Sequence, residues 1–239
     1  MRLVDPTSSS DQPDSLSAAR ISHSNLSSKV YQALRSSLAI GELMPGQKLT
    51  GRMLSEKLGV SQTPVREAML QLVAERALTM NINRSVTVPT LSREKFVELR
   101  DMRVALEGLA ARCAAEHVQA QHITALKALH KKMIAAKREG QYSTTLRLNR
   151  EIHFGVYELS QRQELVAMIE SLWVRTGPYL NLIYKNVDPN KIEPHEHEAL
   201  FSALKARDAQ ACEASIVRDI IEGGRPILAH LVTAANVGG

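Results

Sequence analysis

Cysteine, aromatic residues and long apolar runs are scarce in this chain of 239 residues, and each shortage excludes a class of protein. The two cysteines, Cys113 and Cys212, stand far apart in sequence, which excludes a disulfide framework and a zinc knuckle. No apolar run of about 18 residues is present, so no membrane-spanning helix is expected. With only 3 Phe, 1 Trp and 5 Tyr, the core must be built mainly from Leu, Ala, Val, Ile and Met. Because Ala, Leu and Met are strong helix formers, a mainly helical fold is expected.

The first 25 residues contain no apolar segment of the kind that a signal peptide requires. They are rich in Ser and Asp, include two prolines and show little apolar periodicity. Such a segment cannot bury enough surface to order itself, so residues 1–25 are predicted to form a disordered tail. With neither a signal peptide nor a membrane span expected, the protein is predicted to be cytoplasmic.

The net charge of +5 is concentrated in one part of the chain. Residues 25–90 hold eight Lys and Arg against four Asp and Glu, which leaves an excess of four positive charges. Residues 91–239 hold twenty Lys and Arg against eighteen Asp and Glu. A basic excess on a small module suggests a polyanionic partner, although an excess of this size is also found on ordinary protein surfaces.

Three short helices are predicted within residues 26–77. The first has an apolar residue at every fourth position, at Leu26, Val30, Leu34 and Leu38. Met44–Gly46 is then predicted to form a turn. The second helix is expected to begin at Thr50 and to end at Gly59. Ser61 and Pro64 are residue types favoured at the start of the third helix.

Two β-like runs follow, at residues 78–82 and 86–89, and Asn83, Arg84 and Ser85 join them. A winged helix-turn-helix has this pattern: three helices, with a tight turn between the last two, and then a hairpin. Residues 26–90 are therefore predicted to be a DNA-binding domain of this type.

Beyond residue 90 the chain is predicted to be entirely helical. Long amphipathic segments alternate with short polar joints, and Ser92 and Asp208 are expected to cap the first and last of the main helices. A kink is expected at Gly177-Pro178, and Asp188-Pro189 with Pro194 should introduce a further helix. The pattern predicts that residues 91–235 form an all-α bundle of six or seven helices.

The segment Leu58–Met69 resembles the helix-turn-helix of the GntR family of bacterial transcription regulators. The upstream segment Gly41–Leu49 is similar to the turn that precedes this motif in the family, and the helical part resembles the ligand-sensing FCD domain of its FadR subfamily. Together these resemblances cover about residues 26–230. They imply a homodimeric, ligand-responsive regulator, for example a repressor, that binds a palindromic operator in double-stranded DNA.

The first residues of the third predicted helix are the candidate DNA-reading residues, because a recognition helix enters the major groove with its N-terminal end. Arg66 is suited to a bidentate contact with guanine, and Gln62 to adenine or a phosphate. An ion pair with Glu67 or Glu75 is the alternative role for Arg66. At position 62 the family usually has Arg, so the operator sequence cannot be transferred to this chain. The complete set of candidates is Arg52, Ser61, Gln62, Thr63, Arg66, Asn83, Arg84 and Ser85.

Four polar residues on otherwise apolar helix faces are candidate metal ligands. Asn149 and His153 are four positions apart and share one face of a helix, while His197 and Asp219 belong to two later helices. The resemblance implies an acidic or amide residue and three histidines at these places, and Asp219 stands where the third histidine is expected. Imidazole and carboxylate ligands suit Zn²⁺, Ni²⁺ or Mn²⁺. The alternative is a pair of core histidines with Asp219 as their hydrogen-bond partner.

The resemblance also implies a small organic acid as effector. Arg103 and Arg175 are candidates for binding its carboxylate, because guanidinium groups bind carboxylates bidentately, and Tyr179 is one turn from Arg175. A surface role or a pairing with Glu is the alternative for each arginine. The competing class for the whole protein is a metal-dependent helical hydrolase, but no nucleophile elbow, zinc-protease motif or phosphate-binding loop is present. We therefore expect a regulator and no enzymatic activity.

Overall fold

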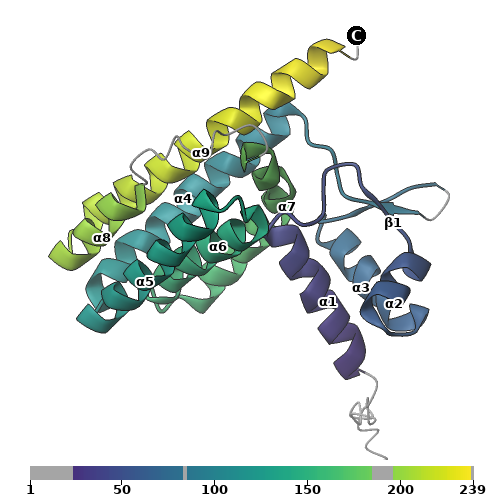
Figure 1. Cartoon of the computed structure of the whole chain (residues 1–239), viewed down its shortest axis with the longest axis horizontal. Coiled ribbons are helices and arrows are strands. Elements are labelled where there is room, and N and C mark those ends of the chain that lie inside the picture. Colours follow the sequence, from purple (N-terminus) through teal and green to yellow (C-terminus); the bar gives the residue numbers. More distant parts are fainter. Residues whose placement is uncertain (1–23, 83–84, 185–195, 238–239) are drawn as a thin grey trace, which may run out of the picture.

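The computed structural model describes residues 24–82, 85–184 and 196–237, which form a small head and a larger helical bundle (Figure 1). The head consists of α1 (Ser24–Ala39), β1 (Lys48–Leu49), α2 (Gly51–Leu58), α3 (Gln62–Ala74), β2 (Thr79–Met80) and β3 (Val86–Thr87). The bundle consists of α4 (Arg93–His117), α5 (Ala120–Arg138), α6 (Tyr142–Glu158), α7 (Gln163–Tyr184), α8 (Glu196–Ala206) and α9 (Ala209–Val237). This arrangement confirms the predicted fold class, and the described bundle has six helices.

The helices of the head begin and end where the sequence chemistry predicts. The Thr50 hydroxyl accepts a hydrogen bond from the Met53 backbone N–H at 3.2 Å and caps the start of α2. Gly59 adopts a left-handed conformation with φ 66° after the last residue of α2, a conformation that glycine adopts without strain. Ser61 precedes α3 in extended conformation, but its side chain forms no capping hydrogen bond with the described residues.

A three-stranded antiparallel sheet completes the head, in the order β1-β3-β2. Val86 of β3 is paired with Leu49 on one side and with Met80 on the other. The sequence predicted β2 and β3, but not β1, which follows the predicted turn at Met44–Gly46. Two residues are too few to show the alternation that identifies a strand, and β1 exists because β3 supplies its hydrogen-bonding partner.

The bundle is organised around two long helices, α4 and α9, which lie against each other (Figure 1). Ser92 caps α4 through a hydrogen bond from the Lys95 N–H at 3.2 Å, and Asp208 caps α9 through one from the Ala211 N–H at 3.0 Å. α5 and α6 form an antiparallel pair, and α7 and α8 pack within the same core. The largest fully buried side chains of this core include Trp173, Tyr157 and Phe201. The predicted helix start at Asp188-Pro189 and Pro194 lies outside the described residues.

The head and the bundle meet where α1 packs against α7 (Figure 1). Val174 of α7 is 1% exposed and belongs to the apolar core of the head. Gly177 lies so close to the end of α1 that an added Cβ atom would stand 2.3 Å from the Leu38 carbonyl oxygen. Arg35 of α1 forms an ion pair with Glu170 of α7, with 2.5 Å between Nη1 and Oε2. α7 therefore contributes to both parts of the molecule.

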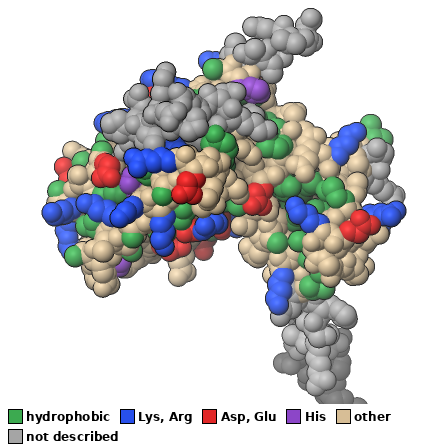
Figure 2. Space-filling model, viewed as in Figure 1, with side chains coloured by type: hydrophobic (Ala, Val, Ile, Leu, Met, Phe, Trp, Pro, Cys, Tyr) green, Lys and Arg blue, Asp and Glu red, His purple; other side chains and the backbone are tan. Residues whose placement is uncertain are grey.

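The surface carries Lys and Arg side chains on both the bundle and the head (Figure 2). None of the helices described combines the length and the apolar character needed to span a bilayer.

Candidate functional site

The N-terminal end of α3 presents polar side chains to solvent in the head. Gln62, Thr63 and Arg66 are exposed, as is Ser61 immediately before the helix. Pro64 and Val65, between them, are buried in the core of the head and hold this face outward. Exposed polar side chains at the N-terminal end of a helix are what major-groove reading requires.

Arg66 is not tied to an acidic neighbour. The Glu67 carboxylate accepts a hydrogen bond from Ser27, and Glu75 accepts one from the Tyr31 hydroxyl at 2.7 Å. Arg66 Nη2 contacts Gln62 Oε1 at 3.4 Å, and within the described part of the chain it forms no ion pair. Its full positive charge is thus available to a phosphate or a guanine.

Of the remaining candidate DNA contacts, the structure describes Arg52 and Ser85 but not Asn83 and Arg84. The Arg52 side chain is 82% exposed and pairs with Glu56 at 2.9 Å, a surface interaction that contributes little to stability. Ser85 precedes β3, and its hydroxyl accepts a hydrogen bond from the Asn81 amide at 2.9 Å. Asn83 and Arg84, the predicted tip of the wing, lie outside the described residues.

Three of the four predicted metal ligands converge in the bundle, each from a different helix. His153 comes from α6, His197 from α8 and Asp219 from α9. His153 Nε2 lies 3.2 Å from His197 Nε2 and 3.2 Å from Asp219 Oδ2. The three ligand atoms lie within 4.8 Å of one another, and both histidines are 1% exposed. Two imidazole nitrogens and one carboxylate oxygen in this arrangement suit a divalent transition metal. Asn149 is half-buried one turn before His153.

A third histidine, His130 on α5, lies beside this cluster and was not predicted. Its Nδ1 is 3.3 Å from His197 Nδ1, and its Nε2 is 3.4 Å from Glu198 Oε1. Burial lowers the pKa of His130 and outweighs the opposite effect of Glu198. The sequence did contain a signal, because His130 follows Leu126 by four positions and falls on the buried face of its helix.

The three candidate effector residues lie in two different places. Arg103 is buried in the bundle and pairs with Glu107, its Nε donating to Oε1 at 2.5 Å, which is the paired alternative considered from the sequence. Arg175 is half-buried. Burial is the larger cause that lowers its pKa, and the positive charge of the nearby Arg76 in the head lowers it further. The Tyr179 hydroxyl donates to the Pro89 carbonyl at 3.3 Å, in the segment that joins the two parts. Arg175 and Tyr179 therefore belong to the junction.

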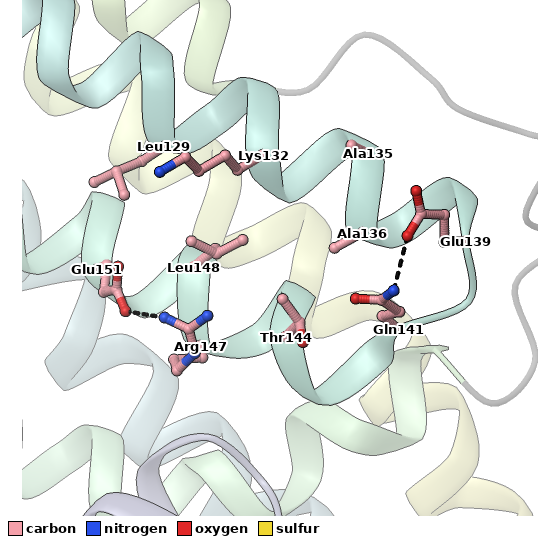
Figure 3. A pocket seen from close by; sticks show the side chains of 10 residues that line it. All are labelled: Leu129, Lys132, Ala135, Ala136, Glu139, Gln141, Thr144, Arg147, Leu148 and Glu151. Atoms are coloured by element: carbon pink, nitrogen blue, oxygen red, sulfur yellow. Dashed lines mark hydrogen bonds and ion pairs between the residues drawn. The ribbon is translucent and has the colours of Figure 1, made fainter.

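A surface cavity of about 350 Å³ lies between α5 and α6 (Figure 3). Lys132 and Leu129 border it from α5, and an ion pair between Arg147 and Glu151, at 2.5 Å, borders it from α6. None of the three converging residues lines this cavity. It is an open groove between the two helices and is separate from the histidine cluster.

Comparison with known proteins identifies both parts of the chain. Residues 26–88 match the bacterial regulatory proteins of the gntR family, and residues 98–222 match the FCD domain. The HTH-type transcriptional regulator McbR of Escherichia coli K12 is 35% identical over 195 residues, covering 81% of this chain and 88% of McbR. The Nta operon transcriptional regulator of Aminobacter aminovorans is 27% identical, covering 74% of this chain and 82% of that protein.

Solved structures agree with this assignment. The structure of E. coli McbR/YncC superposes with a TM-score of 0.81 at 32% identity, covering 88% of this chain and 99% of that one. A regulator from Rhodococcus sp. RHA1, 19% identical with a TM-score of 0.68, shares the fold. These relatives are regulators, so the alternative of a metal-dependent hydrolase is set aside. The chain belongs to the GntR family of bacterial regulatory proteins, and it is a DNA-binding transcriptional regulator rather than an enzyme.

Proposed function

We propose that this protein is a ligand-responsive regulator, with an FCD domain of the FadR type, that binds a palindromic operator as a homodimer. Its affinity for DNA would be set by a small organic acid bound at a metal site in the bundle. The observation that carries the proposal is the convergence of two buried histidines, His153 and His197, with the partly exposed Asp219. A regulator whose bundle served only for dimerisation would have no need of such a site.

The donor set is suited to Zn²⁺, Ni²⁺ or Mn²⁺, and we expect Asn149, one turn before His153 on α6, to add an amide oxygen. With Asn149 as a fourth ligand, an octahedral ion keeps positions open, and Zn²⁺ gains one by expanding to five-coordination. A carboxylate of an organic acid is a suitable ligand for such a position. Asp219 also brings a negative charge that compensates part of the charge of the ion.

The path from this site to the head runs through α7. The Trp173 ring lies 5.3 Å from the His153 ring, between centroids, while the next residue, Val174, is buried in the core of the head. Glu170, one turn earlier, pairs with Arg150 of the bundle and with Arg35 of the head. A ligand that favours one position of α7 would thus favour one placement of the head, provided that it binds the two arrangements with different affinities.

Metal analysis of protein purified without a chelator or a His tag tests the site. Wild-type protein and a His230→Ala control should hold one divalent ion per chain, whereas His197→Ala should hold none. His230 is exposed, so the control removes a histidine elsewhere. Absence of stoichiometric metal from the wild type would contradict the metal-dependent part of the proposal.

Ligand binding can be followed by the fluorescence of Trp173, because it is the only tryptophan of the chain and it lies against His153. A thermal-shift screen of organic acids, each with and without Zn²⁺, should identify acids that raise the midpoint only when the metal is present. Those acids should also change the Trp173 emission and the operator affinity. An acid that stabilises the protein equally without metal would argue against coordination to the ion.

Gel-shift titration at fixed salt tests the DNA-reading residues. Arg66→Ala should weaken specific binding about 5- to 150-fold, the scale of one bidentate contact with a base of about 1–3 kcal/mol. Arg112→Ala is the matched control, because Arg112 is an exposed bundle residue paired with Glu213. Equal affinities of the two variants would refute the assignment of Arg66. Sedimentation of the complex should give two chains per operator.

A further inference from the structure

A chain of buried polar side chains leads from α4 to the imidazole of His153. Arg103 donates to both oxygens of Glu107, from Nε at 2.5 Å and from Nη2 at 3.3 Å. The Tyr157 hydroxyl donates to Glu107 Oε2 at 2.5 Å, and His153 Nδ1 lies 2.8 Å from the same hydroxyl. Glu107 and Tyr157 are completely buried, and Arg103 is 8% exposed. Such a fully connected network in a core specifies one arrangement of its members.

The direction of each hydrogen bond in this chain follows from the groups themselves. Arg103 has only donors, so both oxygens of Glu107 act as acceptors toward it. The Tyr157 hydroxyl carries a single proton, and its oxygen lies 2.5 Å from Glu107 Oε2. That single proton is donated to Glu107, and the phenol oxygen is left as an acceptor for His153 Nδ1–H.

We infer that Tyr157, held by Glu107 and Arg103, is a positioning residue that accepts a hydrogen bond from Nδ1–H of His153 and so leaves the lone pair of Nε2 for a metal ion. The inference rests on the proposed metal site, since Nε2 is the atom that faces Asp219 Oδ2 and His197 Nε2 at 3.2 Å each. The lone pair of His153 Nε2 and the Asp219 carboxylate together form two adjacent ligand atoms for a cation. Metal-binding histidines commonly donate their second N–H to such a partner.

Arg103 holds Glu107 in this network, which differs from the effector-binding role expected from the sequence. Its guanidinium lies over the Trp173 ring, 4.6 Å from the centroid, and two of its donor groups are used by Glu107. Arg103 therefore acts on the site through Glu107 and Tyr157. Its two hydrogen bonds hold the Glu107 side chain in place, and without them the Tyr157 proton would lose its fixed acceptor.

The test combines nitrogen NMR of ¹⁵N-histidine-labelled full-length protein with Zn²⁺ affinity. In metal-free wild type, at a pH well above the ordinary pKa of imidazole, His153 should carry its proton on Nδ1. Tyr157→Phe should lose this preference and should bind Zn²⁺ about 10- to 100-fold more weakly, the usual effect of removing such a partner. Tyr31→Phe is the matched control, because Tyr31 also donates to a glutamate, Glu75, but does so in the head. Its Zn²⁺ affinity should equal that of the wild type.

Two results would overturn the inference: a wild-type His153 protonated on Nε2, or a Tyr157→Phe protein with unchanged tautomer and unchanged Zn²⁺ affinity. If Tyr157→Phe does not fold, the tautomer of wild-type His153 decides alone. The tautomer measurement needs no metal. If the wild type fails to bind Zn²⁺, the proposed metal site is refuted, and the tautomer of His153 still tests the positioning role of Tyr157.

Discussion

Substitution of Gly177 by Ala should loosen the contact between the head and the bundle. A Cβ atom at this position would lie 2.3 Å from the Leu38 carbonyl oxygen and 2.6 Å from that of Ala39. Both contacts are with backbone atoms at the end of α1, which cannot rotate away as a side chain can. Helix α1 or α7 must therefore shift, and overpacking of this kind costs about 1–3 kcal/mol.

An opposing effect must be subtracted from this cost. Alanine in a helix interior is favoured over glycine by about 0.5–1 kcal/mol. Because the clash is with backbone atoms at 2.3 and 2.6 Å, the steric cost should lie in the upper part of its range, about 2–3 kcal/mol, and the free energy of unfolding should fall by about 1–2.5 kcal/mol. At about 2–4 °C per kcal/mol for a chain of this size, the melting midpoint should fall by about 2–10 °C.

Gly223→Ala provides the control for this prediction. Gly223 is also inside a helix, α9, but it is exposed and nothing lies within 4 Å of an added Cβ. This variant should be more stable than the wild type by about 0.5–1 kcal/mol. Differential scanning calorimetry of the three proteins measures both effects. Equal stabilisation by the two substitutions would show that the close approach of α1 to α7 does not constrain the protein.

Three further predictions concern stability and ligand linkage. Thr50→Ala should lower the free energy of unfolding by about 1 kcal/mol, whereas Ser61→Ala, which loses no capping bond, should change it by less than about 0.5 kcal/mol in urea titrations. A double-mutant cycle of Arg35→Ala and Glu170→Ala should give a coupling of about 1 kcal/mol, and additive effects would contradict the ion pair between head and bundle. Zn²⁺ at about 100 times its Kd should stabilise the wild type by about 2.7 kcal/mol, and EDTA should reverse the shift in midpoint.

Predictions from the sequence were accurate where local chemistry decides the structure. Thr50, Ser92 and Asp208 mark helix starts because a side-chain oxygen close in sequence accepts a backbone N–H of the first turn. Gly59 ends α2 because it adopts a left-handed conformation at no steric cost. The strand β1 was missed, because its two residues are defined by pairing with β3 and carry no pattern of their own.

The candidate metal site was only partly predictable. Periodicity placed His153, His197 and Asp219 on inner helix faces. Whether their side chains meet depends on the packing distance and rotation of each helix. His130 lies on an equally suitable face, and only the packing of α5 against α8 brings it to His197. Likewise, the spacing of Arg103 and Glu107 by four residues permits an ion pair, but only the fold adds Tyr157 as its third member.

The two-part architecture, the helix boundaries set by capping residues and glycines, and the family could all be predicted from the sequence, because each depends on residues that are close together in the chain. Tertiary structure alone decided that Gly177 touches the end of α1, that Arg35 and Glu170 join the head to the bundle, and that Tyr157 connects Glu107 to His153. These contacts join residues far apart in sequence. Their existence depends on the packing distance and rotation of whole helices, and no local pattern records either quantity.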